Sequence, residues 1–130
     1  MTILPITLCA AAAAAAINIW LSIRVGAIRS ARKISIGDGG DLALVARMRA
    51  HANFIENTPI VLILIALIEM ARTGSPYLMG VAAIYLLGRV AHGLGMDGGT
   101  LGSGRLVGTM ITLLTQLGLG IWAVSIVLDM

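Results

Sequence analysis

Four apolar stretches follow one another along this chain, joined by short connections. A helix needs about 20 apolar residues to cross the hydrocarbon core of a bilayer. The first stretch, residues 1–23, and the last, residues 106–128, contain no Asp, Glu, Lys or Arg. We therefore predict a single domain over residues 1–130, an all-α integral membrane protein with four transmembrane helices at roughly residues 3–28, 42–71, 76–95 and 105–128.

Composition supports this class, because 58% of the residues are hydrophobic and only 12% are charged. A soluble domain of ordinary composition carries about twice that share of charge. The alanine run at residues 10–16 is similar to the cleavage region of a secretory signal, but no Lys or Arg precedes it. We expect the first stretch to remain as a transmembrane helix. Asp41 and Ser75 are expected to cap the second and third helices, with Pro76 as the first helical residue.

The cations predict an orientation in the membrane. Eight of the nine lie toward the ends joined by the first and third connections: Arg24, Arg29, Arg32, Lys33, Arg47, Arg49, Arg89 and Arg105. Arg72 alone lies at the opposite ends. Cytoplasmic loops carry an excess of Lys and Arg, so we expect the first and third connections in the cytoplasm and both termini on the other side.

One segment carries charge directly into an apolar helix. Arg49, Asn53 and Glu56 stand at positions i, i+4 and i+7, followed by Asn57 and Pro59 and then by a long apolar run. This spacing places the first three on one helical face, where we expect Arg49 and Glu56 to pair when no ligand is present. Ionisable residues at membrane depth indicate a functional site by default. A structural ion pair, with Asn53 bonding a neighbouring helix, is the alternative.

Polar residues elsewhere favour structural interpretations. Thr109, Thr112 and Gln116 form a stripe beside Gly104 and Gly108, which is typical of interhelical hydrogen bonding and close packing.

Two further positions have structural alternatives. Arg89 and His92 share a face near the end of the third helix, and a histidine there is more often structural than catalytic. Glu69 is expected to meet water or Arg72.

Several kinds of site are not indicated. Cys9 is the single cysteine, no Cys/His cluster has metal-ligand spacing, and no glycine-rich segment has a nucleotide fingerprint. The net charge of +3 has no nucleic-acid motif with it. We expect no metal and no nucleic-acid partner.

The run from Arg49 through Asn53 and Glu56 to Pro59, followed by an apolar segment, resembles the second-helix signature of the MAPEG family, membrane-associated proteins in eicosanoid and glutathione metabolism. The sequence around Arg89 and His92 is similar to that family's third helix. Arg105 lies where its fourth helix begins. The resemblance covers nearly the whole chain.

This resemblance implies a homotrimer of four-helix subunits that binds glutathione as co-substrate between neighbouring subunits, near the cytoplasmic face. The positions that match glutathione-contacting or nearby residues of the family are Arg49, Asn53, Glu56, Arg89 and His92. Arg105 matches the arginine that stabilises the glutathione thiolate. A basic residue at the end of the first helix, Arg24 or Arg29, is a further candidate.

The resemblance therefore implies a transferase or peroxidase acting on hydrophobic electrophiles from the bilayer. The chain departs from the pattern at Met96, where several glutathione-using members carry tyrosine. Two alternatives stay open. One is a non-catalytic protein of the same fold that binds lipid or a partner, and the other is a small proton-coupled exporter that uses Glu56.

Overall fold

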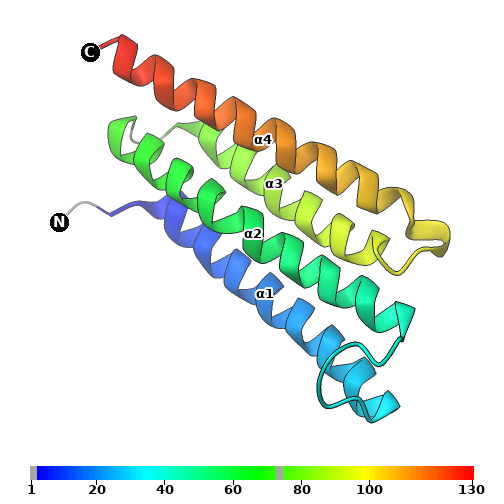
Figure 1. Ribbon diagram of the computed structural model, residues 1–130. Helices are drawn as coiled ribbons and strands as arrows, with labels where there is room; N and C mark the ends of the chain where they lie inside the picture. The colour runs from blue at the N-terminus through cyan, green and yellow to red at the C-terminus, as the bar shows by residue number, and fades with distance from the viewer. Residues whose placement is uncertain (1–2, 73–74) are drawn as a thin grey trace.

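The chain forms a bundle of four long helices in a computed structural model that describes residues 3–72 and 75–130 (Figure 1). The helices are α1 (Pro5–Arg32), α2 (Leu42–Ala71), α3 (Pro76–Gly95) and α4 (Ser103–Leu128), with the 3-10 turn η1 (Gly99–Leu101) before α4. All 4 long helices have the length and composition to cross a membrane. No strand occurs in the described ranges, so the prediction of an all-α membrane bundle of four helices is confirmed.

Two helices begin at the capping residues that the sequence predicts. The side chain of Asp41 accepts a hydrogen bond from the Leu44 N–H at 2.9 Å, and Ser75 Oγ accepts one from the Leu78 N–H at 3.4 Å. These oxygens satisfy N–H groups that have no carbonyl partner in the first helical turn. Pro76 follows Ser75 in the first turn of α3, where a missing N–H does no harm.

The first helix extends beyond residue 28, to Arg32. Arg29 and Arg32 lie in its last turn, where their charge interacts favourably with the negative end of the helix dipole. Lys33 then ends the helix in the left-handed conformation, with φ of 57°.

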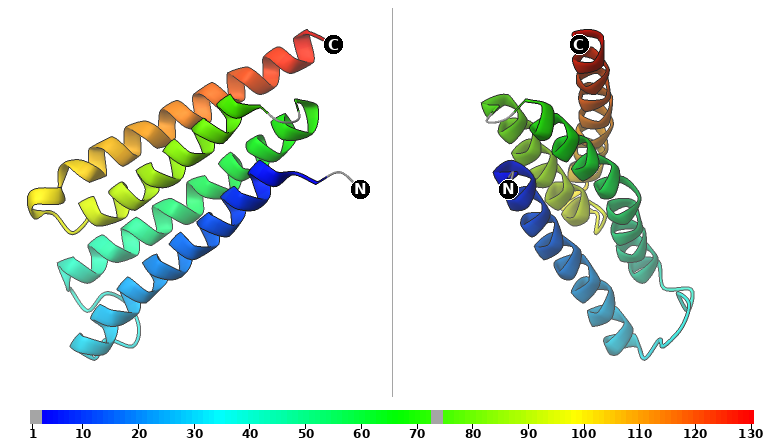
Figure 2. Two further views of the ribbon diagram at one scale, coloured as in Figure 1. Left: turned by 180° about the vertical axis from the view of Figure 1, so that it is seen from behind. Right: turned by 90° about the vertical axis from the view of Figure 1, so that its left-hand side faces the viewer.

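The bundle has two different ends. Both chain termini lie at one end, and the α1–α2 and α3–α4 connections lie at the other (Figure 1). Every pair of long helices makes contact except α1 and α4, as far as the described residues go. These two helices therefore lie on opposite flanks, which the views in Figure 2 also show.

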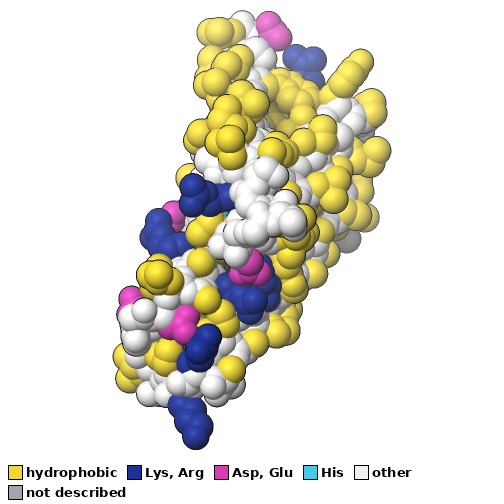
Figure 3. All heavy atoms as spheres, turned by 90° about the vertical axis from the view of Figure 1, so that its right-hand side faces the viewer, with side chains coloured by type: hydrophobic (Ala, Val, Ile, Leu, Met, Phe, Trp, Pro, Cys, Tyr) yellow, Lys and Arg dark blue, Asp and Glu magenta, His cyan; other side chains and the backbone are white. Residues whose placement is uncertain are grey.

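Charged side chains gather at the end that carries the two connections. Figure 3 views the molecule from that side and shows Lys and Arg interspersed with Asp and Glu, with apolar side chains beyond them. Large apolar side chains are exposed on all four helices, for example Ile19, Ile63, Leu87 and Leu117. An apolar surface of this extent suits a multi-pass membrane protein surrounded by lipid. Which end is cytoplasmic stays a prediction.

Glycines bring α3 and α4 unusually close together. A Cβ atom placed on Gly108 would lie 2.5 Å from the carbonyl oxygen of Gly88, and one on Gly104 would lie 2.5 Å from that of Ala91. No side chain fits at these distances, so the two backbones pack directly against each other. The predicted close packing at Gly104 and Gly108 is confirmed, and it fixes the residues of α3 relative to those of α4.

Glu69 has a different role from the one expected. Its carboxylate is buried and accepts hydrogen bonds from the N–H groups of Ile6 and Thr7, at 2.9 and 2.8 Å, and from Thr7 Oγ1 at 2.7 Å. The expectation of water or Arg72 as its partner is wrong, because the first turn of α1 offers free N–H donors beside the end of α2. Arg72 instead pairs with Asp129 at 3.4 Å.

Candidate functional site

The second helix presents two opposite charges on its outer surface. Arg49 and Glu56 are both exposed, and neither forms an ion pair or a side-chain hydrogen bond within the described ranges. The predicted pairing between them is absent. Seven residues along a helix correspond to a rise of about 10 Å, so the two groups share a face but stand two turns apart.

Glu56 is exceptional among the carboxylates. The other five are occupied within the described residues: Asp41 by Arg32, Asp97 by Arg24 and Arg47, Asp129 by Arg72, Asp38 by the N–H of Gly40, and Glu69 by the start of α1. Glu56 alone is left without such a partner, in the middle of a membrane-spanning helix. Because ionisable side chains at membrane depth usually have a partner, Glu56 is a candidate residue of the functional site.

The cations likewise divide into those that have a partner within the described residues and those that do not. Arg24, Arg32, Arg47 and Arg72 are in ion pairs, Arg29 donates to backbone carbonyls, and Arg89 donates to neutral side chains. Across the described ranges, the cations with neither kind of partner are Lys33, in the first connection, Arg49 and Arg105, near the start of α4. Apart from Lys33, the charges left over by the fold are thus Arg49, Glu56 and Arg105.

Arg89 lies in the core of the bundle, where it joins three helices. It is 1% exposed and donates to Asn53 Oδ1 on α2 at 2.6 Å and to Thr112 Oγ1 on α4 at 2.7 Å. One of its nitrogens also lies 3.4 Å from His92 Nδ1. Arg89 and His92 are therefore both buried behind Asn53, which is only half-buried. Sequence reasoning missed Thr112 as a partner of this arginine.

Two more polar contacts join helices in the interior of the bundle, beside those of Arg89. Gln116 on α4 donates to the side-chain oxygen of Asn57 at 2.8 Å, and the hydroxyls of Thr58 and Tyr85 lie 2.9 Å apart. The predicted interhelical bonding is confirmed for Gln116 and Thr112. Thr109 differs, because its hydroxyl bonds the Arg105 carbonyl of its own helix at 2.9 Å.

Arg24 is held by contacts within the chain. It pairs with Asp97, donates to the Gly93 carbonyl at 2.7 Å, and its guanidinium lies 4.8 Å from the centre of the Trp20 ring. Arg47 binds the same carboxylate at 3.1 Å. The charge of Arg24 is thus already paired with a carboxylate of the same chain. The tie through Asp97, which sequence reasoning also missed, connects α1, α2 and the segment after α3.

Arg29 donates to the carbonyl oxygen of Gly37 at 2.9 Å and so holds the first connection.

Met96 lies beside these charges. Together with Arg47, Asp97 and three apolar residues of α2 it lines a groove of about 440 Å³. The position at which the resemblance places a tyrosine is thus at the charged end, with a thioether in place of a phenol.

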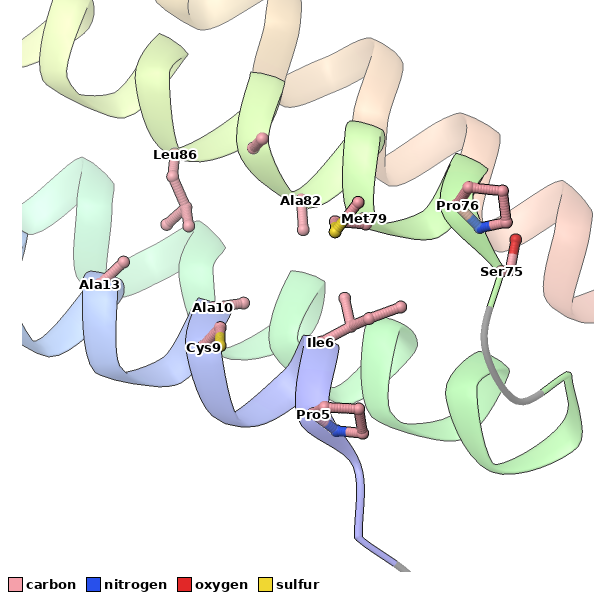
Figure 4. A pocket seen from close by; sticks show the side chains of 11 residues that line it. Pro5, Ile6, Cys9, Ala10, Ala13, Ser75, Pro76, Met79, Ala82 and Leu86 are labelled. Carbon is pink, nitrogen blue, oxygen red and sulfur yellow. The ribbon is translucent and has the colours of Figure 1, made fainter.

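A second groove, of about 540 Å³, opens between α1 and α3 toward the end that carries the termini (Figure 4). Cys9, Ala10 and Ala13 face Ala82 and Leu86 across it. It contains none of the predicted site residues. Among the described residues no group of acidic, histidine and cysteine side chains could hold a metal ion.

A family model, described as the MAPEG family, matches residues 7–125. The chain belongs to the MAPEG family. A search of curated proteins finds no match. MAPEG is a family of membrane-embedded, glutathione-related transferases and isomerases. The matched part of this MAPEG protein includes Arg49, Asn53, Glu56 and Arg105.

Proposed function

We propose that this protein is a membrane-bound transferase or peroxidase that uses glutathione to modify hydrophobic electrophiles. The observation that carries the proposal is the set of charges without partners in the subunit. Arg49, Glu56 and Arg105 remain unsatisfied after the described carboxylates and cations have been paired, apart from Lys33 in a connection. Membership of the MAPEG family supports glutathione as the ligand.

The charges of glutathione complement this set. Glutathione carries two carboxylates, one ammonium group and one thiol. A guanidinium such as that of Arg49 binds a carboxylate with two parallel hydrogen bonds, and Glu56 can accept from the ammonium group. Asn53 lies between Arg49 and Glu56 in the sequence and is half-buried, and its side chain adds an amide to the site. Arg105 is then available to the sulfur.

Arg105 has the chemistry needed to activate the thiol. A nearby cation favours thiolate over thiol, and thiolate is the nucleophile. In a transfer reaction the sulfur attacks an electrophilic carbon, a C–S bond forms, and the leaving group departs with its electron pair. An apolar electrophile can arrive from the bilayer, since the surrounding helix surfaces are apolar.

The site requires protein cover. Arg49 and Glu56 are exposed on a single subunit, and ionisable side chains at membrane depth avoid lipid. A homotrimer with glutathione between neighbouring subunits covers them, and it agrees with the resemblance of the second helix.

The first experiment measures glutathione binding by calorimetry on detergent-purified protein, with thiolate absorbance recorded on the same samples. We expect saturable binding to the wild type and its loss in Arg49→Ala. Lys33→Ala is the matched control, because it removes another unpartnered cation that lies outside the proposed site, and it should bind normally. Absence of binding to the wild type at millimolar glutathione would contradict the proposal.

A second experiment addresses the sulfur. Arg105→Ala should lower conjugation of a hydrophobic electrophile at least 100-fold while glutathione affinity changes less, because a transition-state interaction is removed. Arg105→Lys should recover part of the rate, since it restores a positive charge. Full activity in Arg105→Ala would exclude the assigned role.

Met96 favours a second candidate, a non-catalytic protein that binds lipid or a membrane partner. This candidate predicts no turnover with any electrophile, even when glutathione binds.

A proton-coupled exporter is the third candidate, and it needs a carboxylate free of any cation, a condition that Glu56 meets within the subunit. It offers no role for the unpartnered Arg49 and Arg105. Proton-driven substrate uptake by proteoliposomes that is lost in Glu56→Gln would establish it.

A further inference from the structure

Arg89 is a buried charge without a countercharge. Its partners at 2.6, 2.7 and 3.4 Å are an amide oxygen, a hydroxyl and an imidazole nitrogen. No carboxylate lies within ion-pair distance among the described residues, and its Nε atom is buried without a hydrogen-bond partner. Burying a cation in this way is costly. A structural contact between helices could be made by a neutral residue, so the charge itself asks for an explanation.

The arginine fixes which way the Asn53 amide points. A guanidinium only donates hydrogen bonds, so the group that lies 2.6 Å from it must be the Asn53 oxygen. The opposite orientation would bring two donors together. The Asn53 NH₂ group is therefore turned away from Arg89, and it has no acceptor within the described residues. Because Asn53 is half-buried, this free donor belongs to the accessible side of the residue.

The hydrogen bonds of Thr112, on the other side of Arg89, have a donor–acceptor direction that agrees with this orientation. The Thr112 hydroxyl donates to the Gly108 carbonyl at 2.9 Å, which leaves its lone pairs to accept from Arg89 at 2.7 Å. A chain of hydrogen bonds thus runs from Asn53 through Arg89 and Thr112 to the backbone of α4. The same logic makes His92 Nδ1 an acceptor, so the proton of the neutral ring is on Nε2.

We propose that Arg89 is a positioning residue that holds Asn53 as a hydrogen-bond donor, so that the site selects a ligand with a carbonyl or carboxylate oxygen at this position. The inference rests on the proposed function, in which glutathione supplies that oxygen from a peptide carbonyl or a carboxylate. The charge of Arg89 also favours an anionic ligand nearby, since the medium around it is weakly polarisable.

Asn53→Asp is the sharpest test, because it keeps the shape of the side chain. One carboxylate oxygen still accepts from Arg89, while an acceptor replaces the outward NH₂ group. We expect the melting temperature to stay the same or rise and glutathione binding to weaken at least tenfold. The matched control is Asn18→Asp, where the half-buried Asn18 accepts from His51 at 2.8 Å between α1 and α2. It adds the same charge and should leave binding unchanged.

A second measurement remains available if Asn53→Asp fails to fold. The side-chain amide resonances of ¹⁵N-labelled protein are followed by NMR during a glutathione titration. In the wild type the Asn53 NH₂ signal should shift on binding. Arg89→Lys keeps a donor against the amide oxygen and should preserve the shift, whereas Arg89→Met should lose it and weaken binding several-fold. A contact that served only to hold the helices together would not move this signal.

The outcomes separate the inference from the function that it extends. If the wild type binds glutathione and a folded Asn53→Asp variant binds equally well, the donor role is overturned and the proposed function stands. The same holds if the Asn53 signal does not move on binding. If the wild type does not bind glutathione, both are overturned.

Discussion

At the scale of single residues, Glu69 shows how a membrane helix can contain a carboxylate without a cation beside it. Its oxygens accept from two backbone N–H groups and one hydroxyl at the start of α1. The positive end of the α1 dipole adds to these bonds. The residue thus fastens the beginning of α1 to the end of α2, at the opposite end of the bundle from the Asp97 tie.

Replacing Glu69 tests this role. Glu69→Leu should lower the free energy of unfolding by about 3 kcal/mol, because it leaves the N–H groups of the half-buried Ile6 and Thr7 without acceptors. Thermal unfolding in detergent measures the loss, and hydrogen exchange should accelerate at these two amides first. Thr7→Val removes only the hydroxyl and should cost about 1 kcal/mol. An unchanged melting temperature in Glu69→Leu would contradict the assignment.

The site could be predicted in part from residue type and depth. Arg49 and Glu56 stand out because charge is rare in apolar helices, and Arg105 because it matches an arginine of the MAPEG family. Apart from Lys33, these are the charged side chains without an ion pair or a side-chain hydrogen bond among the described residues. The missing Arg49–Glu56 pair could have been foreseen from the helical rise. The role of Arg89 could not, because its partner Thr112 is on another helix and only the packed bundle brings them together.

At the scale of elements, the α3–α4 contact depends on glycines, which have no side chain to keep the two backbones apart. Gly88, Gly104 and Gly108 let the two backbones touch, and Thr112 follows Gly108 by one turn. The hydrogen bond from Arg89 to Thr112 therefore depends on the same close approach. The close approach of α3 and α4 therefore contributes both to the stability of the bundle and to the position of Arg89 behind Asn53.

Gly108→Ala should separate these helices. The added methyl would lie 2.5 Å from the Gly88 carbonyl oxygen and 2.5 Å from the Cβ atom of His92. We expect a loss of about 1–3 kcal/mol in the free energy of unfolding, together with weaker glutathione binding. Gly118→Ala is the control on the same helix, because nothing lies within 4 Å of its added methyl. Equal melting temperatures for the two variants would contradict the close-packing account.

Element ends followed the sequence where capping chemistry was local. Asp41 and Ser75 cap their helices because their oxygens reach N–H groups three residues ahead. The end of α1 could not be placed, since a charged last turn extends it to Arg32. The partners of Asp97 were also beyond prediction, because Arg24 and Arg47 are distant in sequence.

At the scale of the whole molecule, the two ends of the bundle differ in charge. The end that carries the connections has most of the cations (Figure 3). Arg72, which follows the last residue of α2, lies at the other end. The two ends are separated by helices of up to 30 residues, about 45 Å along the axis. This asymmetry is the basis for expecting the connections in the cytoplasm.

Thiol labelling of intact cells tests the orientation. In a Cys9→Ala background, Ile36→Cys places one thiol in the first connection and Met130→Cys places one at the opposite end, and both native side chains are exposed, at 90% and 99%. A membrane-impermeant maleimide should label the second variant from outside and the first only after lysis. The reverse pattern would show that the orientation is inverted.

The gathering of charge at one end also bears on how the chain enters a membrane. Inserted from the cationic side, the bundle carries three charged side chains to the far side: Glu69, Arg72 and Asp129. Together they have one net negative charge, so a membrane potential that is negative inside assists their passage. The assistance is about 2.3 kcal/mol for each 100 mV. Biogenesis of this protein should therefore slow when the potential is collapsed.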